Sequence, residues 1–111
     1  MWQIYYIYEI TKTINDKKYI GSTWRNIYIR LCEHIYNAIV FNKERKFNKL
    51  NHFIKTILSE GNDPSKILTI KIIDIIETDN KNNVLELEQW YINKFDTLEN
   101  GYNTINTIKK I

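Results

Sequence analysis

The sequence predicts an α+β fold, in which a small three-stranded antiparallel sheet is flanked by helices in the order ββααβα. Two observations predict it: runs of isoleucine and aromatic residues alternate with segments whose apolar residues recur every three or four positions. The 111 residues, 43% of them hydrophobic and 14% aromatic, suit one globular domain. We therefore expect a single domain over residues 1–111, with its helices packed on the sheet.

The strands are predicted from β-branched and aromatic residues. Residues 3–10 form such a run, and residues 17–22 follow the turn-forming pair at 15–16, so the chain should begin with a β-hairpin. A third strand is expected over residues 67–76, where the alternation of apolar positions shifts phase at 72–73. Such a shift indicates a bulge or a strand that is buried on both faces.

Three helices are predicted from apolar residues at helical spacing, over residues 26–41, 46–60 and 82–95. Gly61 stands where a C-cap glycine belongs, and Pro64 should prevent the second helix from resuming. The predicted apolar stripes are Tyr28, Leu31, Cys32, Ile35 and Ile39 on the first helix and Phe47, Leu50, Ile54, Ile57 and Leu58 on the second.

Charge and composition narrow the classes of function. The net charge is +3, with +5 carried by residues 1–60 and −2 by residues 61–111. A basic first half favours a surface that faces phosphates, although scattered solvated charges would give the same totals. The single cysteine, Cys32, excludes an intrachain disulfide, and no apolar run approaches the ~20 residues of a membrane span. We expect a soluble, intracellular protein with no membrane partner and no signal peptide.

A set of polar residues follows the predicted elements in order. Its members are Ile7-Tyr8 and Tyr19-Ile20-Gly21 on the hairpin, Arg30 and His34 on the first helix, Glu88 on the third helix, and Gly101-Tyr102-Asn103 after it. This ordered set, which covers essentially the whole chain, resembles the signature of the GIY-YIG nuclease family. One departure from that signature is Tyr6, which occupies the position of the glycine in the first motif.

The resemblance implies a metal-dependent endonuclease that hydrolyses phosphodiester bonds in DNA by a one-metal, in-line mechanism, leaving 3′-hydroxyl and 5′-phosphate ends. Mg²⁺ is the implied cofactor, and Mn²⁺ should substitute for it. Related nucleases gain target choice from an attached recognition domain, so a homodimer or a separate DNA-recognition partner is left open. The alternative is a nucleic-acid-binding module of the same fold with weak catalysis, acting within a larger complex.

The two motif tyrosines are expected on one face of the sheet. With a two-residue turn, Tyr8 pairs with Thr23 and Tyr19 pairs with Lys12, and a slip of one residue would separate the tyrosines. Gly21 shares this face, where its missing side chain would let a phosphate approach.

The resemblance makes Tyr8 the general base, with Tyr19 positioning water or the water ligands of the metal. Most strand tyrosines only pack against their neighbours, and this remains the alternative for each one taken alone. A base role requires loss of a proton that is held with a pKa of ~10 in water. Lys17, Arg30 or a metal-bound water would have to lower that pKa.

Arg30 and His34 lie four residues apart on the first helix, so they point the same way and border its apolar stripe. A guanidinium can hold two phosphate oxygens, and the resemblance makes Arg30 the group that stabilises transition-state charge. His34 either assists the nucleophile or a leaving-group oxygen, or is a packed helical histidine.

Glu88 falls within the apolar stripe of the third helix, which comprises Val84, Leu85, Tyr91, Ile92 and Phe95. A carboxylate in such surroundings must be paired, protonated or bound to a metal. The resemblance makes Glu88 the single protein ligand of the divalent cation, and Mg²⁺ accepts one carboxylate while keeping several waters. An ion pair with Arg30 and no metal is the alternative.

The remaining candidates lie in the tail and around the second helix. Residues 99–111 are expected to form a loop, where the resemblance gives Asn103 a supporting role in the active-site network. A basic cluster could follow a nucleic-acid backbone, although a solvated helix face is an equal alternative. The members of this cluster are Lys43, Arg45, Lys46, Lys49 and Lys55.

Overall fold

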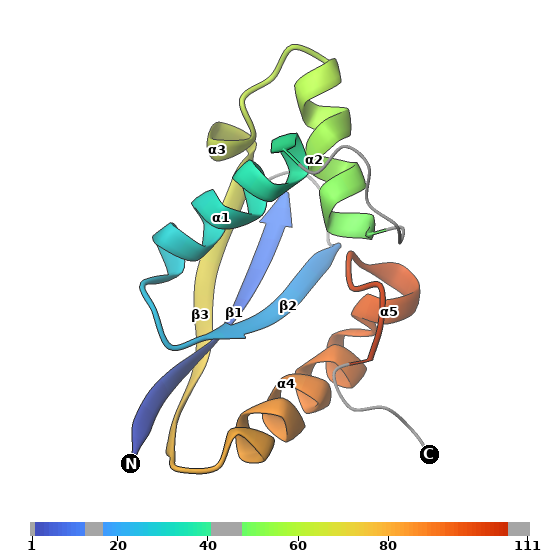
Figure 1. Ribbon diagram of the computed structural model, residues 1–111. Coiled ribbons are helices and arrows are strands. Elements are labelled where there is room, and N and C mark those ends of the chain that lie inside the picture. Colours follow the sequence, from blue (N-terminus) through green and yellow to red (C-terminus); the bar gives the residue numbers. More distant parts are fainter. Residues whose placement is uncertain (1, 13–16, 41–47, 107–111) are drawn as a thin grey trace.

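A three-stranded antiparallel sheet in the order β2-β1-β3 lies at the centre of the molecule (Figure 1). This computed structural model describes residues 2–12, 17–40 and 48–106. The elements are β1 (Gln3–Lys12), β2 (Lys18–Thr23), α1 (Ile27–Val40), α2 (Lys49–Ser59), α3 (Pro64–Ile67), β3 (Leu68–Thr78), α4 (Lys81–Phe95) and α5 (Thr97–Asn100). The α+β class and the order of the longer elements are confirmed, and the one-turn helices α3 and α5 are additions.

Helices cover both faces of the sheet. Successive side chains of a strand point to opposite faces, so β1 sends Tyr8 and Ile10 into a core with α1 and α2, and Ile7 into a second core. In the second core Ile7 packs with Val84 and Ile92 of α4. Figure 1 shows α1 and α2 in the upper part of the view and α4 in the lower part. The central strand is therefore buried on both sides.

The hairpin register differs from the predicted one by two residues. Tyr8 lies opposite Gly21, and Tyr19 lies opposite Ile10. Because side chains alternate with a period of two, this even shift leaves every side chain on its predicted face. The predicted turn at residues 15–16 lies outside the described residues.

Of the two alternatives predicted for β3, a bulge or a strand buried on both faces, the bulge is present. Ile7 pairs with Asp74 and the next residue, Tyr8, pairs with Ile72, so Ile73 is an extra residue in β3. The bulge accounts for the phase shift of the apolar pattern in this strand.

The end of α2 follows the prediction at Gly61 and departs from it at Pro64. Gly61 has a φ of 79°, and the N–H of Asn62 donates to the carbonyl of Ile57 at 3.1 Å, which closes the helix end. Pro64 does more than end a helix, because it begins α3 behind the N-cap Asp63. Proline suits this first helical position, where its missing N–H would have no partner in the helix.

The buried face of α1 is rotated from the predicted stripe. The residues that α1 buries are Ile27, Leu31, His34 and Ala38. Tyr28, with 65% of its surface exposed, and Ile39, with 49%, face outward, and Cys32 is exposed. Of the predicted stripe, Leu31 is buried and Ile35 is partly buried against the core. The different buried face turns His34 inward.

The stripes on the other helices are closer to prediction. In α2, Leu50, Ile54 and Ile57 are buried while Leu58 is exposed, and Phe47 lies outside the described residues. In α4, Val84 and Ile92 are buried and Phe95, at the last turn, is exposed. Across residues 2–12, 17–40 and 48–106, none of the helices has the length and apolar character required to cross a bilayer.

Candidate active site

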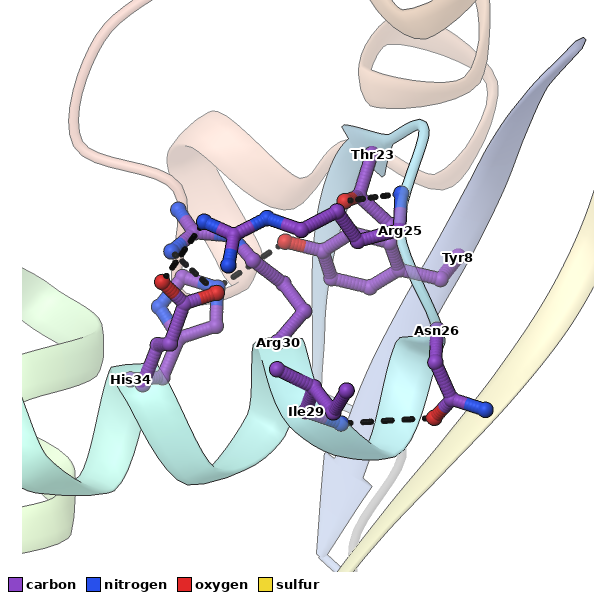
Figure 2. Close-up of polar contacts among 8 residues, drawn as sticks. Tyr8, Thr23, Arg25, Asn26, Ile29, Arg30 and His34 are labelled. Carbon is purple, nitrogen blue, oxygen red and sulfur yellow. Dashed lines mark hydrogen bonds and ion pairs between the residues drawn. The ribbon is translucent and has the colours of Figure 1, made fainter.

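Tyr8 stands at the centre of the candidate site. It extends from the middle strand β1, where burial on both sides leaves none of its surface exposed. Its hydroxyl shares a hydrogen bond of 2.9 Å with Nε2 of His34, which reaches it from α1 (Figure 2). The inward rotation of α1 therefore brings the predicted histidine onto the predicted tyrosine.

Tyr19 lies on the same face, as predicted, and is partly exposed. Its ring centroid lies 6.3 Å from that of Tyr8 and 5.2 Å from that of His34. Tyr19 also lines a cleft of about 340 Å³ together with Glu88 and Asn103. The structure thus brings four predicted residues together around Tyr19, which connects the buried Tyr8 with the solvent-accessible cleft.

Gly21 serves the packing of Tyr8. It is the residue opposite Tyr8 in the hairpin, and a side-chain carbon at Gly21 would overlap the Tyr8 phenol and come within 3.0 Å of the Tyr19 ring. The space that we expected for a phosphate is therefore filled by Tyr8. Glycine is required at position 21 because the Tyr8 ring occupies the space that a Cβ would fill.

Burial opposes ionisation of both tyrosines. It raises the pKa of Tyr8 well above its usual value, the charge of Tyr19 adds to this, and the guanidinium of Arg30 lowers it. Burial and the Glu88 carboxylate raise the pKa of Tyr19 to about 12, again against Arg30. Of the candidates predicted to lower the pKa values of the tyrosines, Arg30 does so for both, but its effect does not outweigh that of burial.

His34 is a neutral partner for Tyr8. Burial, followed by the charge of Arg30, lowers the pKa of His34 to about 3. The imidazole is therefore uncharged at neutral pH and presents one ring nitrogen as an acceptor. It is well suited to hold the Tyr8 hydroxyl and poorly suited to take a proton from water.

Arg30 is paired on α1 with a residue that the sequence interpretation did not include. Its Nη1 lies 3.9 Å from Oε1 of Glu33, and Nη2 of Arg25 lies 3.2 Å from Oε2 of the same carboxylate. The spacing of Arg30 and Glu33, three residues apart on a helix, was a signal for this contact. Arg25 gives no such signal, because it precedes the helix and meets Glu33 only after folding.

Asn103 acts on the site through the backbone of β2. Its Oδ1 accepts from the N–H of Ile20 at 2.8 Å, and its Nδ2 donates to the carbonyl of Ile20 at 2.9 Å. Gly101 allows this approach, because a side chain there would collide with the backbone of Lys18 and Thr97. The tail thus holds the edge strand on either side of the residue between Tyr19 and Gly21.

Replacing Asn103 with alanine should destabilise the protein by about 2–4 kcal/mol, because the N–H and carbonyl of Ile20 both lose buried partners. Asn82→Ala, at an exposed position in the first turn of α4, is the matched control and should change stability little. Urea unfolding of both variants measures the difference. Equal stabilities would show that Asn103 does not fasten β2.

Glu88 offers a place for a divalent cation. Among the described residues that line the cleft it is the one acidic side chain, and the amide groups of Asn48, Asn103 and Asn106 surround the same space. The oxygens of these three amides already accept hydrogen bonds within the protein, from Ile20, Asn51 and Gln89. The Glu88 carboxylate is therefore the group that would hold a cation, and Mg²⁺ accepts one carboxylate while keeping several waters. The donor set therefore fits a mostly hydrated Mg²⁺.

Two members of the predicted basic cluster, Lys49 and Lys55, lie within the described residues. Lys43, Arg45 and Lys46 lie outside the described residues. Lys49 donates from its ammonium to the carbonyl of Leu98 and lines a second hollow, of about 290 Å³, together with Lys17. Lys17 thus lies at a different hollow from the cleft of Tyr19, and Lys55 is half-buried on α2.

Comparisons with known proteins match this arrangement. The model of the GIY-YIG catalytic domain matches residues 4–103. The uncharacterized protein 019R of Invertebrate iridescent virus 6 is 33% identical over 116 residues, which cover 97% of this chain and 34% of that protein. This chain thus spans about a third of the length of its viral relative.

A solved structure shares the fold. The catalytic domain of the intron endonuclease I-TevI, in a mutant form, superposes with a TM-score of 0.70 at 20% identity, covering 97% of this chain and 100% of that chain. The sheet order and the helices on both of its faces define a small α+β domain. Because the family model extends over residues 4–103, the chain belongs to the GIY-YIG family.

Proposed function

We propose that the chain is an endonuclease that cuts DNA by metal-assisted, in-line hydrolysis of a phosphodiester bond. The observation that supports this proposal most is the convergence of a cation, two phenols and a carboxylate at one site. Arg30 and Glu88 both act electrostatically on Tyr19, and Arg30 and Tyr19 both act on Tyr8. Hydrolysis of a phosphodiester requires a positioned water, a base and positive charge at the phosphate. Tyr19 can position the water, Tyr8 can act as the base, and Arg30 carries the positive charge.

The residues have separate roles in this proposal. Tyr8 is the general base, and His34 holds its hydroxyl in place. Tyr19 faces the cleft and positions the attacking water. Arg30 binds the scissile phosphate and stabilises the charge that develops on its oxygens. Asn103 keeps β2, and with it Tyr19, at the edge of the cleft.

The cofactor in this proposal is Mg²⁺, which Glu88 would hold and which Mn²⁺ should replace. When bound, the cation would neutralise phosphate charge and favour ionisation of nearby groups. Arg30 on α1 would provide a second positive charge, in addition to the cation held by Glu88 on α4. The cut would leave a 3′-hydroxyl and a 5′-phosphate.

A plasmid assay tests this function. Supercoiled DNA incubated with the protein and Mg²⁺ should be converted to nicked circles, and EDTA should prevent it. DNA ligase should reseal the nicks, because it requires a 3′-hydroxyl beside a 5′-phosphate. A protein that shifts the mobility of DNA without cutting it, with Mg²⁺ or Mn²⁺ present, would instead be a nucleic-acid-binding module of this fold.

The pH dependence, together with Tyr8→Phe, distinguishes Tyr8 from His34 as the base. Because the pKa of Tyr8 is raised, Tyr8 is protonated at neutral pH, and each pH unit increases its phenolate fraction about tenfold. We therefore expect log kcat to rise with a slope of about one from about pH 6 to about pH 9. Tyr8→Phe should remove both the slope and most of the activity.

The contrasting outcome for the base is a flat profile. His34, with a pKa near 3, would be fully available as a base over this whole range, so its rate would not change with pH. A rate that is constant above about pH 5 and survives in Tyr8→Phe would exclude Tyr8 as the base.

A further inference from the structure

Two arginines share the Glu33 carboxylate, and one of them, Arg30, also acts on Tyr8. Oε2 of Glu33 lies 3.2 Å from Arg25, and its Oε1 lies 3.9 Å from Arg30. Figure 2 shows the Arg25 side chain extending from the turn after β2 toward the side chain of Arg30. Two positive charges and one negative charge leave this corner of the site with a net positive charge.

The carboxylate is not saturated by its partners. Among the described residues no group donates a hydrogen bond to Oε1 of Glu33, although this oxygen is buried. Its distance of 3.9 Å to Arg30 is that of an ion pair and is too long for a hydrogen bond. Each guanidinium carries five N–H donors, so both arginines keep donors for another anion.

Arg25 is anchored at its base and accessible at its tip. Its backbone N–H donates to Oγ1 of Thr23 at 3.0 Å, which fixes the turn that leads from β2 into α1. Its side chain is 46% exposed, against 31% for Arg30. The guanidinium can therefore reach a ligand in solvent without rearrangement of the backbone.

We propose that Arg25 is a second phosphate-binding residue of this site, and that Glu33 is a positioning residue that keeps the guanidinium groups of Arg25 and Arg30 side by side. The inference rests on the proposed function and adds the neighbouring phosphate of the same DNA strand to it. Arg30 takes the scissile phosphate, and Arg25 takes the next one. Two guanidinium groups would otherwise repel each other, and the carboxylate between them offsets that repulsion.

The Glu33 carboxylate and a phosphodiester can bind arginine in the same way. A carboxylate and a phosphodiester each present two oxygens to the planar donors of arginine, so groups that hold Glu33 are also arranged to hold a phosphate. Glu33 remains between the arginines in the complex and orients their remaining donors. Arg25 therefore contributes mainly to binding, and Glu33 contributes mainly to the orientation of Arg30 in the transition state.

The test compares Arg25→Ala, Arg25→Lys and Glu33→Gln with the wild type and with Lys66→Ala, which removes an exposed lysine on α3. Binding of a fluorescent duplex is measured by anisotropy in EDTA over a series of salt concentrations, and cleavage is measured separately with Mg²⁺. Arg25→Ala should weaken Kd about tenfold and reduce the slope of log K against log salt by about 0.9, and its loss in kcat should be smaller than its loss in Kd. Arg25→Lys should restore the salt slope, because it keeps the charge.

Glu33→Gln should change kcat more than Kd, which is the opposite of Arg25→Ala. Its kcat should fall about tenfold while Kd stays equal or becomes tighter, because a negative charge near the phosphates is removed. Lys66→Ala should match the wild type in both measurements.

Three outcomes would overturn the inference. An Arg25→Ala variant with an unchanged salt slope does not lose a phosphate contact, and a Glu33→Gln variant with a raised kcat makes Glu33 a competitor of the substrate. Either result leaves the proposed function intact when the wild type still cuts DNA. A wild type that neither binds nor cuts DNA would refute the proposed function and this inference together.

Discussion

Arg30→Ala is expected to lower kcat by about a hundredfold or more while KM changes only a few-fold. Two effects of the guanidinium are lost together. It stabilises the charge that develops on the phosphate oxygens, and it is the positive charge that lowers the pKa of Tyr8 against burial. Both effects act on the transition state, so the loss falls on turnover rather than on binding.

Steady-state cleavage of a labelled duplex separates the two parameters for Arg30→Ala and Arg30→Lys. Lysine keeps a positive charge near Tyr8 but cannot hold two phosphate oxygens in a fixed plane, so we expect only partial recovery of kcat. The folded state should change little, because Arg30 is about one-third exposed and its ion pair is long. If kcat and binding fell by the same factor, Arg30 would be an ordinary phosphate contact.

The faces of the hairpin could be predicted from the sequence because a strand has a period of two. Tyr8 and Tyr19 needed only the correct parity of register, and a shift of two residues preserved it. The structure shows that Gly21 is required by the Tyr8 ring opposite it. Which residue fills a space beside a glycine depends on the register itself, and the pattern of residues does not contain that information.

The face of α1 could not be predicted in the same way, since apolar residues lie all around this helix. Tyr28, Cys32 and Ile39 of the predicted stripe are exposed, whereas Ile27, Leu31 and Ala38 are buried and Ile35 packs partly buried beside them. The second set is buried because it brings small and branched residues against the sheet, and the larger Tyr28 remains at the surface. His34 lies on the same face as the second set and is therefore buried, where it forms a hydrogen bond with Tyr8.

The supporting contacts of the site join residues that are far apart in sequence. Asn103 and Ile20 are 83 residues apart, and no local pattern relates them. The motif identified Asn103 as part of the site, and the fold explains how it contributes, through the backbone of β2. Arg25 lacked any motif, so its place beside Glu33 follows only from the packing of the β2–α1 turn on the helix.

Glu88→Gln should reduce cleavage to background while leaving DNA binding intact or tighter. Glutamine keeps the shape of the side chain and removes the negative charge, so a divalent cation loses its carboxylate ligand. Arg25 and Arg30 still contact the phosphates, and the missing negative charge lowers the repulsion of DNA. Gel-shift and plasmid assays with Mg²⁺ measure both properties, and Glu86→Gln, an exposed residue on the same helix, is the matched control.

Thermal melts separate the metal role of Glu88 from a structural one. If Glu88 holds Mg²⁺, the wild type should gain stability from Mg²⁺ because a ligand that binds only the folded state raises its stability, and Glu88→Gln should not. The metal-free variant should melt at the same temperature as the wild type or slightly higher, since a partly desolvated carboxylate has been neutralised. If Glu88 were instead half of a buried ion pair with Arg30, its loss would leave a charge uncompensated and destabilise the protein by about 3–5 kcal/mol. A Glu88→Gln protein that melts at a much lower temperature, gains as much stability from Mg²⁺ as the wild type does, and still cuts DNA would exclude the metal assignment.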